Sequence, residues 1–296
     1  MRDFRDHIEL LKTLDRSIVP LTDIVKALDG AGKLPEGAVA ITIDDAYASV
    51  YDNAWPYLRD NKIPFTLFVA TEPVARGQEG YITPKQLREM ATHPGVSIAN
   101  HGHTHSSFAF MSGEAVETEI ETAENLLTEW LGGTPPLLFA FPYGEAGTAA
   151  LEVIDAHGFM AAFGQHSGSV GTYQNRFYLP RFPLSGGYAD EGRLREALST
   201  LPLPHANFAP KNAAVAKGKP PGFIEFTLLA PLSPERLNCF SDGNRLEIKA
   251  NGKHVRIAFP TNAPPPRWRL NCTHPAPNGR WYWLGWQTTL EAKSRE

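Results

Sequence analysis

The segment AVAITIDDAY (38–47) decides the fold, because it joins a predicted buried strand to two acidic side chains. Its first six residues are apolar or β-branched and follow the turn sequence PEG (35–37), a pattern typical of a strand covered on both faces. Strands of this kind belong to parallel sheets whose faces are covered by helices. Asp44 and Asp45 follow directly, so the segment predicts a parallel α/β sheet with polar side chains at a strand end.

The same unit recurs along the first part of the chain. Further buried strands are predicted at FTLFVA (65–70), VSIAN (96–100), LLFAF (137–141) and MAAF (160–163). Helical patterns lie between them, including a long amphipathic helix that begins after Ser112 and ends before Gly132. A strand–helix repeat of roughly thirty residues predicts parallel strands with covering helices. Because parallel α/β barrels place their chemistry at the carboxyl ends of the strands, the polar residues found there form the candidate site.

The organisation of the chain changes after residue 203. Residues 204–222 are rich in proline and lysine and are predicted to be a linker or an extended crossing segment. Residues 223–296 contain short strand patterns separated by hairpin signals, which are DGN (242–244), NG (251–252) and NG (278–279). The predicted domains are a barrel over 1–203, a linker over 204–222 and a small antiparallel, sandwich-like β module over 223–296.

Aromatic side chains are concentrated in this β module. In WYWLGW (281–286), strand alternation places Trp281 and Trp283 on one face and Tyr282 on the other. We expect these rings, together with Trp268, to fill a small core, and stacking on sugar rings is the alternative. In a third interpretation the module closes over an incomplete edge of the barrel.

Composition and charge exclude several classes of function. The chain has 296 residues and a formal net charge of −4, which argues against a nucleic-acid-binding protein with its usual basic face. It contains no apolar run of about 18 residues, so no transmembrane segment is expected. Its first residues lack the features of a signal peptide, which leaves a cytoplasmic protein or a trimmed form of one exported to the periplasm or cell envelope. Cys239 and Cys272 either form one disulfide in an oxidising compartment or pack as small hydrophobic side chains.

A cluster of histidines follows the predicted strand VSIAN. In HGHTH (101–105), residues i and i+4 of a helical turn would share a face, so His101 and His105 can reach one ion while His103 points elsewhere. Together with one aspartate of the pair Asp44–Asp45 they make a three-ligand site with an open position for water or substrate, as catalytic zinc sites have. Imidazole ligands suit zinc and similar first-row metals.

Two further features follow predicted strands. Asp44 adjoins Asp45 but projects differently, so one carboxylate can bind a metal while the other serves as a base. The alternative is that one of the two caps a helix and the other is solvated. The turn FPYG (141–144) can present a backbone N–H to a developing oxyanion.

These motifs together resemble those of a known family. TIDDAY (42–47), the His-x-x-x-His of 101–105 and FPYG (141–144), in this order, are similar to the motifs of the polysaccharide deacetylase family (NodB homology domain, carbohydrate esterase family 4). The resemblance covers roughly residues 4–190 of the chain. It implies a distorted (β/α) barrel and metal-dependent hydrolysis of N- or O-acetyl groups on a glycan. The surroundings of FPYG look closer to deacetylases from exopolysaccharide loci than to chitin deacetylases.

The resemblance also implies a role for each matching residue. Asp44 would be the general base, and Asp45, His101 and His105 would bind a divalent metal, expected to be Zn²⁺, with Co²⁺, Ni²⁺ or Mn²⁺ as alternatives. The backbone N–H of Tyr143 would stabilise the oxyanion. The expected partner is an acetylated glycan, and the sequence does not predict an oligomeric state.

The chain departs from the family pattern around the base. The family usually has glycine where Ala46 stands. Many members have an arginine that orients the base where Ala140 stands, and Arg181 in LPRFP (179–183) is the candidate replacement from another loop. The family's first strand, which contains Tyr-His, has no counterpart before residue 4, as expected for a truncated chain.

The general acid is a further departure, because the late Leu-x-His-Asp motif of many members is not found. His166, which follows the strand MAAF, is the candidate, since histidine can protonate a departing amine near pH 7. The alternative for His166 is a loop residue that hydrogen-bonds its own turn. His205 in LPH matches superficially, but its proline-rich surroundings make it a poor candidate.

Two other functions remain open at this point. One is a metal-dependent hydrolase of a small amide or cyclic amide, which would share the barrel motifs. The other is a non-catalytic carbohydrate-binding protein with a degenerate site. The motif residues argue against it because all four are intact, namely Asp44, Asp45, His101 and His105.

Overall fold

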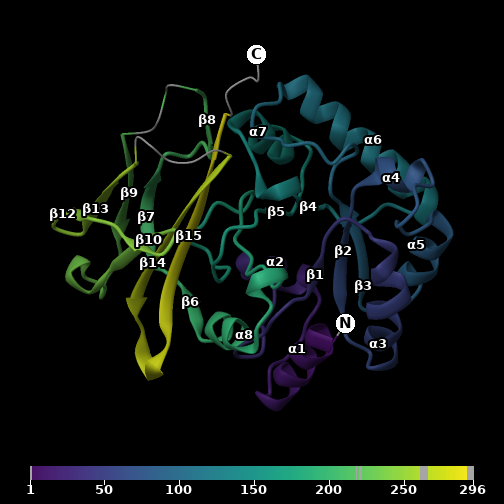
Figure 1. Cartoon of the computed structure of the whole chain (residues 1–296), viewed down its shortest axis with the longest axis horizontal. Helices are drawn as coiled ribbons and strands as arrows, with labels where there is room; N and C mark the ends of the chain where they lie inside the picture. The colour runs from purple at the N-terminus through teal and green to yellow at the C-terminus, as the bar shows by residue number, and fades with distance from the viewer. Residues whose placement is uncertain (1, 218, 220–221, 261–265, 292–296) are drawn as a thin grey trace.

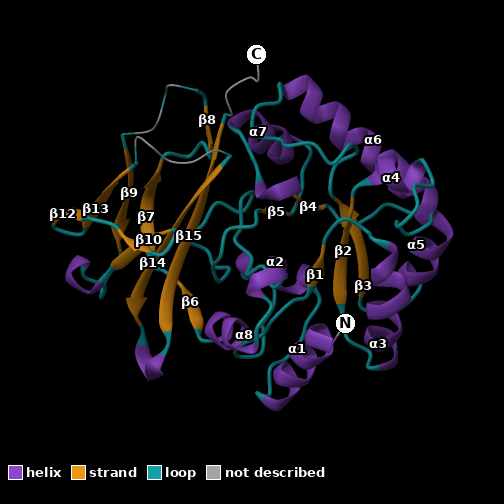
Figure 2. Cartoon of the chain, in the orientation of Figure 1, coloured by secondary structure: helices purple, strands orange, loops and turns teal. Residues whose placement is uncertain are grey.

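A computed structural model describes residues 2–217, 219, 222–260 and 266–291 of the chain. Figure 1 shows a half-barrel of helices and strands, coloured purple to teal, beside an all-β part coloured green to yellow. Figure 2 shows that helices cover the half-barrel, whereas the other part consists almost entirely of strands.

The half-barrel is built on one five-stranded parallel sheet in sequence order. Its strands are β1 (Thr42–Ile43), β2 (Phe65–Val69), β3 (Val96–Asn100), β4 (Leu138–Ala140) and β5 (Ala161–Phe163). The predicted distorted (β/α) barrel is thus confirmed as a curled half-barrel, with β1 and β5 at its two edges. The carboxyl ends of all five strands meet on one side, where the predicted polar residues lie.

The first strand differs from its prediction. AVAITI (38–43) was expected to be one buried strand, but only Thr42 and Ile43 belong to β1, and both are half-buried. Val39 instead forms an isolated bridge with Ile18 in the N-terminal segment. Because β1 lies at the edge of the sheet, it has a neighbouring strand on one side only, and its residues remain half-buried.

Helices cover the sheet as the repeat predicted. They are α1 (Arg2–Thr13), α2 (Leu21–Leu28), α3 (Trp55–Asp60), α4 (Thr71–Ala75), α5 (Pro84–Ala91), α6 (Gly113–Leu131), α7 (Thr148–Ala156) and α8 (Glu191–Leu198). The long predicted helix is α6, whose Ser112 side chain caps its N-terminus and whose Gly132 ends it with a left-handed φ of 72°. Its buried face includes Val116, Ile120 and Leu127. Among the described residues, no helix is both long and apolar enough to span a membrane.

The β module consists of two sheets that share one core. One sheet has the strand order β11-β10-β14-β15-β6, with β8 also paired to β15, and the other has the order β12-β13-β9-β7. The strands are β6 (Thr200–Pro202), β7 (His205–Ala209), β8 (Ala214–Val215), β9 (Phe223–Leu228), β10 (Asn238–Ser241), β11 (Asn244–Arg245), β12 (Ile248–Asn251), β13 (His254–Ala258), β14 (Arg267–Pro275) and β15 (Trp281–Leu290). Apolar side chains of both sheets meet in one cluster, as in a sandwich.

The segment 204–222 is more than the predicted linker. Its strands β7 and β8 pair with β9 and β15, and β6, which precedes it, also pairs with β15. Pro204 and Pro210 flank β7 and lie outside its bounds, so they do not interrupt the strand. The β module of the structure therefore begins at Thr200, ahead of the predicted boundary.

Strand β15 is buried on both faces because it lies between the other sheet and the half-barrel. At Gly285 a side chain would overlap the carbonyl oxygen of Ser167, in the loop after β5. Trp286 lies edge-on to Tyr178 at 5.3 Å between ring centroids, and Trp283 lies edge-on to Phe182 at 5.6 Å. The module thus covers the segment that follows the edge strand β5, in agreement with the third interpretation of its role.

Most aromatic side chains of the module are buried, either in its own core or against the half-barrel. Trp268, Trp283 and Trp286 are buried, whereas Trp281 is 42% exposed. Cys239 and Cys272 face each other across β10 and β14 and form a disulfide whose two residues are fully buried. The pairing resolves the two readings of these cysteines in favour of the bridge.

Candidate active site

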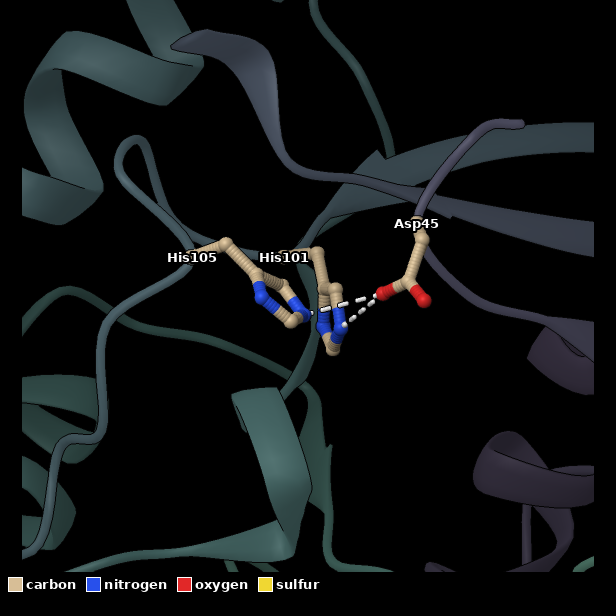
Figure 3. Close-up of side chains that lie close together, drawn as sticks. All are labelled: Asp45, His101 and His105. Atoms are coloured by element: carbon tan, nitrogen blue, oxygen red, sulfur yellow. Dashed lines mark ion pairs between the residues drawn. The ribbon is translucent and has the colours of Figure 1, made fainter. Parts of the chain in front are cut away.

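Asp45, His101 and His105 converge at the carboxyl ends of β1 and β3 (Figure 3). The Nε2 atoms of His101 and His105 lie 3.3 and 3.0 Å from Oδ1 of Asp45. One potential ligand atom from each of the three lies within 4.8 Å of the other two, a spacing that a single ion can bridge.

The histidine segment reaches this arrangement without the predicted helical turn. Residues 101–105 form an irregular loop in which Gly102 and His105 have left-handed φ values of 77° and 58°. The loop is held by Glu119 of α6, whose carboxylate accepts hydrogen bonds from the amides of His103 and Thr104 at 2.8 and 2.9 Å. The predicted helical turn was therefore wrong, although the imidazoles of His101 and His105 do lie together beside Asp45.

The aspartate side of the cluster is also conformationally strained. Asp45 and Ala46 have φ values of 77° and 63°, in the region that side chains rarely adopt. Each such residue costs on the order of 1–3 kcal/mol and persists where surrounding contacts enforce it, often at functional sites. The same geometry explains why glycine would be the easier residue at position 46.

The protonation pattern of the cluster fits a metal cation. His101 Nδ1 lies 2.6 Å from the carbonyl oxygen of Ala140, so Nδ1 carries the proton and Nε2 presents a lone pair. This Nε2 is buried and has no hydrogen-bond partner among the described residues, yet it faces the Asp45 carboxylate. Anionic and lone-pair atoms facing one another are stabilised by a cation between them.

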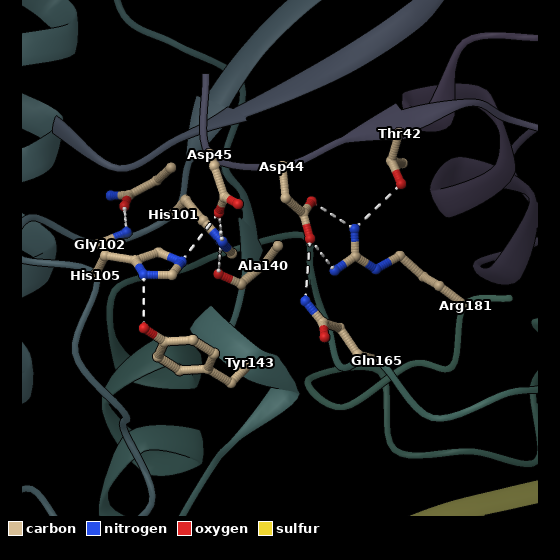
Figure 4. A network of polar contacts seen from close by, with 11 residues as sticks. Thr42, Asp44, Asp45, His101, Gly102, His105, Ala140, Tyr143, Gln165 and Arg181 are labelled. Carbon is tan, nitrogen blue, oxygen red and sulfur yellow. Dashed lines mark hydrogen bonds and ion pairs between the residues drawn. The ribbon is translucent and has the colours of Figure 1, made fainter. Parts of the chain in front are cut away.

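Asp44 lies beside this cluster and points the other way, toward Arg181 (Figure 4). Arg181 Nη1 and Nη2 donate to the two carboxylate oxygens of Asp44 at 2.7 and 2.9 Å, a bidentate pair. Burial would raise the pKa of Asp44, but the charge and hydrogen bonds of Arg181 hold it below its usual range. The structure thus places Arg181 against the candidate base, where the sequence sought a replacement for Ala140.

Further contacts fix the Arg181 guanidinium. Its Nη1 donates to Thr42 Oγ1 at 3.1 Å and its Nε donates to the Gly164 carbonyl oxygen at 2.9 Å. Gln165 Nε2 lies 3.4 Å from Asp44 Oδ2. The sequence analysis missed Gln165, although its place directly after β5, at the same end of the sheet as the other site residues, was a usable signal.

Tyr143 lies at the opposite side of the metal cluster. Its phenol oxygen is 3.1 Å from His105 Nδ1, and its ring lies edge-on to the His105 ring at 4.7 Å. Tyr143 and Gly144 have left-handed φ values of 59° and 67°, which makes the predicted turn a tight one. The amides of Gly144 and Glu145, which follow Tyr143, donate to the carbonyl oxygens of Phe141 and Pro142 within the turn.

His166 does not join these residues. Its ring is 3% exposed and packs between Tyr178 and Trp286, at centroid distances of 4.6 and 6.2 Å. Burial, together with the positive charges of Arg181 and Arg269, lowers the pKa of His166 to about 3. A buried neutral imidazole carries no acidic proton at pH 7, so this position argues against the choice of His166 as general acid.

The buried position of His166 has a consequence for stability. In the unfolded chain His166 binds a proton below about pH 6.5, whereas in the folded protein it stays neutral down to about pH 3. The unfolded state therefore gains protons as the pH falls through this window, and the folded state loses stability. The unfolding free energy of His166→Leu, taken relative to that of the wild type, should increase by about 2 kcal/mol when the pH is lowered from 7 to 5. Denaturant unfolding at both pH values measures this, and a difference that does not change with pH would contradict it.

A polysaccharide deacetylase family model matches residues 31–162, which contain the aspartates, the histidine loop and the Tyr143 turn. Poly-beta-1,6-N-acetyl-D-glucosamine N-deacetylase of Staphylococcus aureus is 28% identical over 195 residues, covering 62% of this chain and 66% of the relative. The match thus spans a little under two thirds of the length of that relative.

Solved structures agree on the fold. IcaB from Ammonifex degensii is 22% identical with a TM-score of 0.60 and covers 67% of this chain and 88% of its own. The deacetylase domain of BpsB from Bordetella bronchiseptica is 20% identical with a TM-score of 0.55, at 60% and 82% coverage. The half-barrel is therefore an established scaffold, whereas the β module begins beyond the end of the family match.

Proposed function

We propose that the chain is a metal-dependent hydrolase that removes N-acetyl groups from a glycan, because a polysaccharide deacetylase family model matches residues 31–162 and the Staphylococcus aureus relative is named as an N-deacetylase. The observation that carries this proposal is the Asp45–His101–His105 cluster beside the Arg181-bound carboxylate of Asp44. A polymer or oligomer of β-1,6-linked N-acetylglucosamine is the proposed substrate, since the relative's name specifies it.

The ligand set favours Zn²⁺, with Co²⁺, Ni²⁺ or Mn²⁺ as alternatives, because two imidazoles and one carboxylate suit these ions. Three protein ligands leave a position open for water or for the acetyl oxygen. When bound, such an ion lowers the pKa of a water molecule and polarises the carbonyl that is attacked.

The other residues of the site handle the proton and the oxyanion. Asp44 accepts the proton of the attacking water, and Arg181 keeps its carboxylate ionised and correctly turned. The backbone amide of Tyr143 donates to the oxyanion that forms on the acetyl carbonyl. With His166 in the core, we expect the proton taken up by Asp44 to be the one delivered to the departing nitrogen.

The test of this function compares substrates of two chemical classes. Purified protein loaded with Zn²⁺ should release acetate from β-1,6-linked N-acetylglucosamine oligomers, and small linear or cyclic amides should be hydrolysed far more slowly. Glycan binding without acetate release would instead support a carbohydrate-binding protein. Faster hydrolysis of small amides would overturn the glycan assignment.

A further inference from the structure

The β module touches the candidate site through one buried side chain. Gln287 on β15 is fully buried, and its Nε2 donates to the carbonyl oxygens of Tyr143 and Gly144 at 3.1 and 3.0 Å. These are the two residues of the site turn that have left-handed backbone conformations. A single amide group from outside the half-barrel therefore bridges both carbonyls of the strained turn.

The orientation of the Gln287 amide is itself determined by the module. Arg269, its cross-strand partner on β14, donates from Nε to Gln287 Oε1 at 3.1 Å. Because arginine can only donate, the amide oxygen must face Arg269 and the amide nitrogen must face the turn. Tyr178 adds a third hydrogen bond, from its hydroxyl to the Gly144 carbonyl at 2.7 Å.

A second contact from β14 holds the same turn. Arg267 Nε donates to Oε1 of Glu145 at 2.6 Å, and the Glu145 side chain is only 6% exposed. The Arg267 guanidinium also lies 5.2 Å from the centre of the Tyr143 ring, within the range of a cation–π contact. Since the ring and hydroxyl of Tyr143 also contact His105, the Tyr143 turn connects the module to the metal cluster.

We propose that Gln287 is a positioning residue of the deacetylase site, which makes the β module part of the catalytic unit. It holds the Tyr143–Gly144 turn in the conformation that aims the Tyr143 amide at the oxyanion. The catalytic role of Gln287 rests on the proposed deacetylase function. Gln287 cannot touch the glycan because it is fully buried, so its effect should appear in kcat and not in KM.

Two variants with different chemistry test this role. Gln287→Met keeps the length of the side chain but has no donor, and Gln287→Glu keeps the bond from Arg269 but places a carboxylate against two carbonyl oxygens. Both should lower kcat by about 10- to 100-fold at saturating Zn²⁺, as expected for a displaced oxyanion donor, with little change in KM. Thr289→Val is the matched control, because Thr289 is buried on the same face of β15 and its hydroxyl has no partner among the described residues. Its kcat should stay at the wild-type value.

A second readout does not depend on activity. In metal-free protein, hydrogen exchange of the backbone amides in residues 141–147 should be faster in Gln287→Met than in the wild type, and unchanged in Thr289→Val. An active wild type with unchanged kcat and unchanged exchange in both Gln287 variants would overturn the inference. A wild type that releases no acetate would overturn the proposed function instead, and the exchange comparison would still decide whether Gln287 holds the turn.

Discussion

Asp44→Asn should keep the bound metal and lose most of its turnover, with kcat lowered by roughly 10²- to 10⁴-fold. Asparagine has the shape of aspartate but cannot accept a proton from water near neutral pH. The metal should remain because the clustered ligand atoms belong to Asp45, His101 and His105, whereas Asp44 points toward Arg181. Acetate release and metal content, measured on the same preparation, check both halves of this prediction.

Asp52→Asn is the matched control for this experiment. Asp52 is an exposed acidic residue in the segment that follows the aspartate pair, so its replacement makes the same chemical change without reaching the site. Its turnover should equal that of the wild type. If Asp44→Asn were as active as Asp52→Asn, Asp44 would not be the base.

His101→Ala should lose both the metal and the activity. His101 is fully buried and its Nε2 has no hydrogen-bond partner among the described residues, so this side chain is already oriented as a ligand by Ala140. Its removal leaves two ligands for the ion, and kcat should fall by at least about 10³-fold, since the metal supplies several kcal/mol of stabilisation. Metal analysis after gel filtration and an acetate assay give the two measurements.

His103→Ala provides the comparison within the same loop. His103 Nδ1 lies 2.9 Å from Thr71 Oγ1 and not in the metal cluster, as the sequence pattern predicted for this histidine. The variant should bind one equivalent of metal and keep its turnover within a few-fold of the wild type. Equal losses in both variants would mean that the loop as a whole, and not the His101 ligand, supports activity.

The parallel sheet and the ligand cluster were predictable because their signals are local. Each strand is a short apolar run, and each polar group stands directly after one, so topology alone brings Asp45 and His101 to the same end of the sheet. Local patterns did not give the backbone path of the histidine loop, because left-handed residues such as His105 are stabilised by contacts such as those of Glu119, which is distant in sequence.

The parts that sequence reasoning misjudged depend on contacts between distant segments. His166 is a polar residue after a strand, like Asp45 and His101, but the packing of Tyr178 and Trp286 around it places it in the core. The proline-rich segment looked like a linker because strands as short as β8 carry almost no periodic signal. Gln287 gave no signal at all, since its contact with the Tyr143 turn spans 144 residues.

A titration of metal-free protein with Zn²⁺, with acetate release from N-acetylglucosamine oligomers as the readout, tests the central claim most directly. Because Asp45, His101 and His105 form one cluster that a single ion can bridge, the rate should rise linearly and stop rising at one equivalent of Zn²⁺. If the rate of acetate release were already maximal in the metal-free protein, or continued to rise beyond one equivalent of Zn²⁺, a single catalytic ion at this cluster would be contradicted.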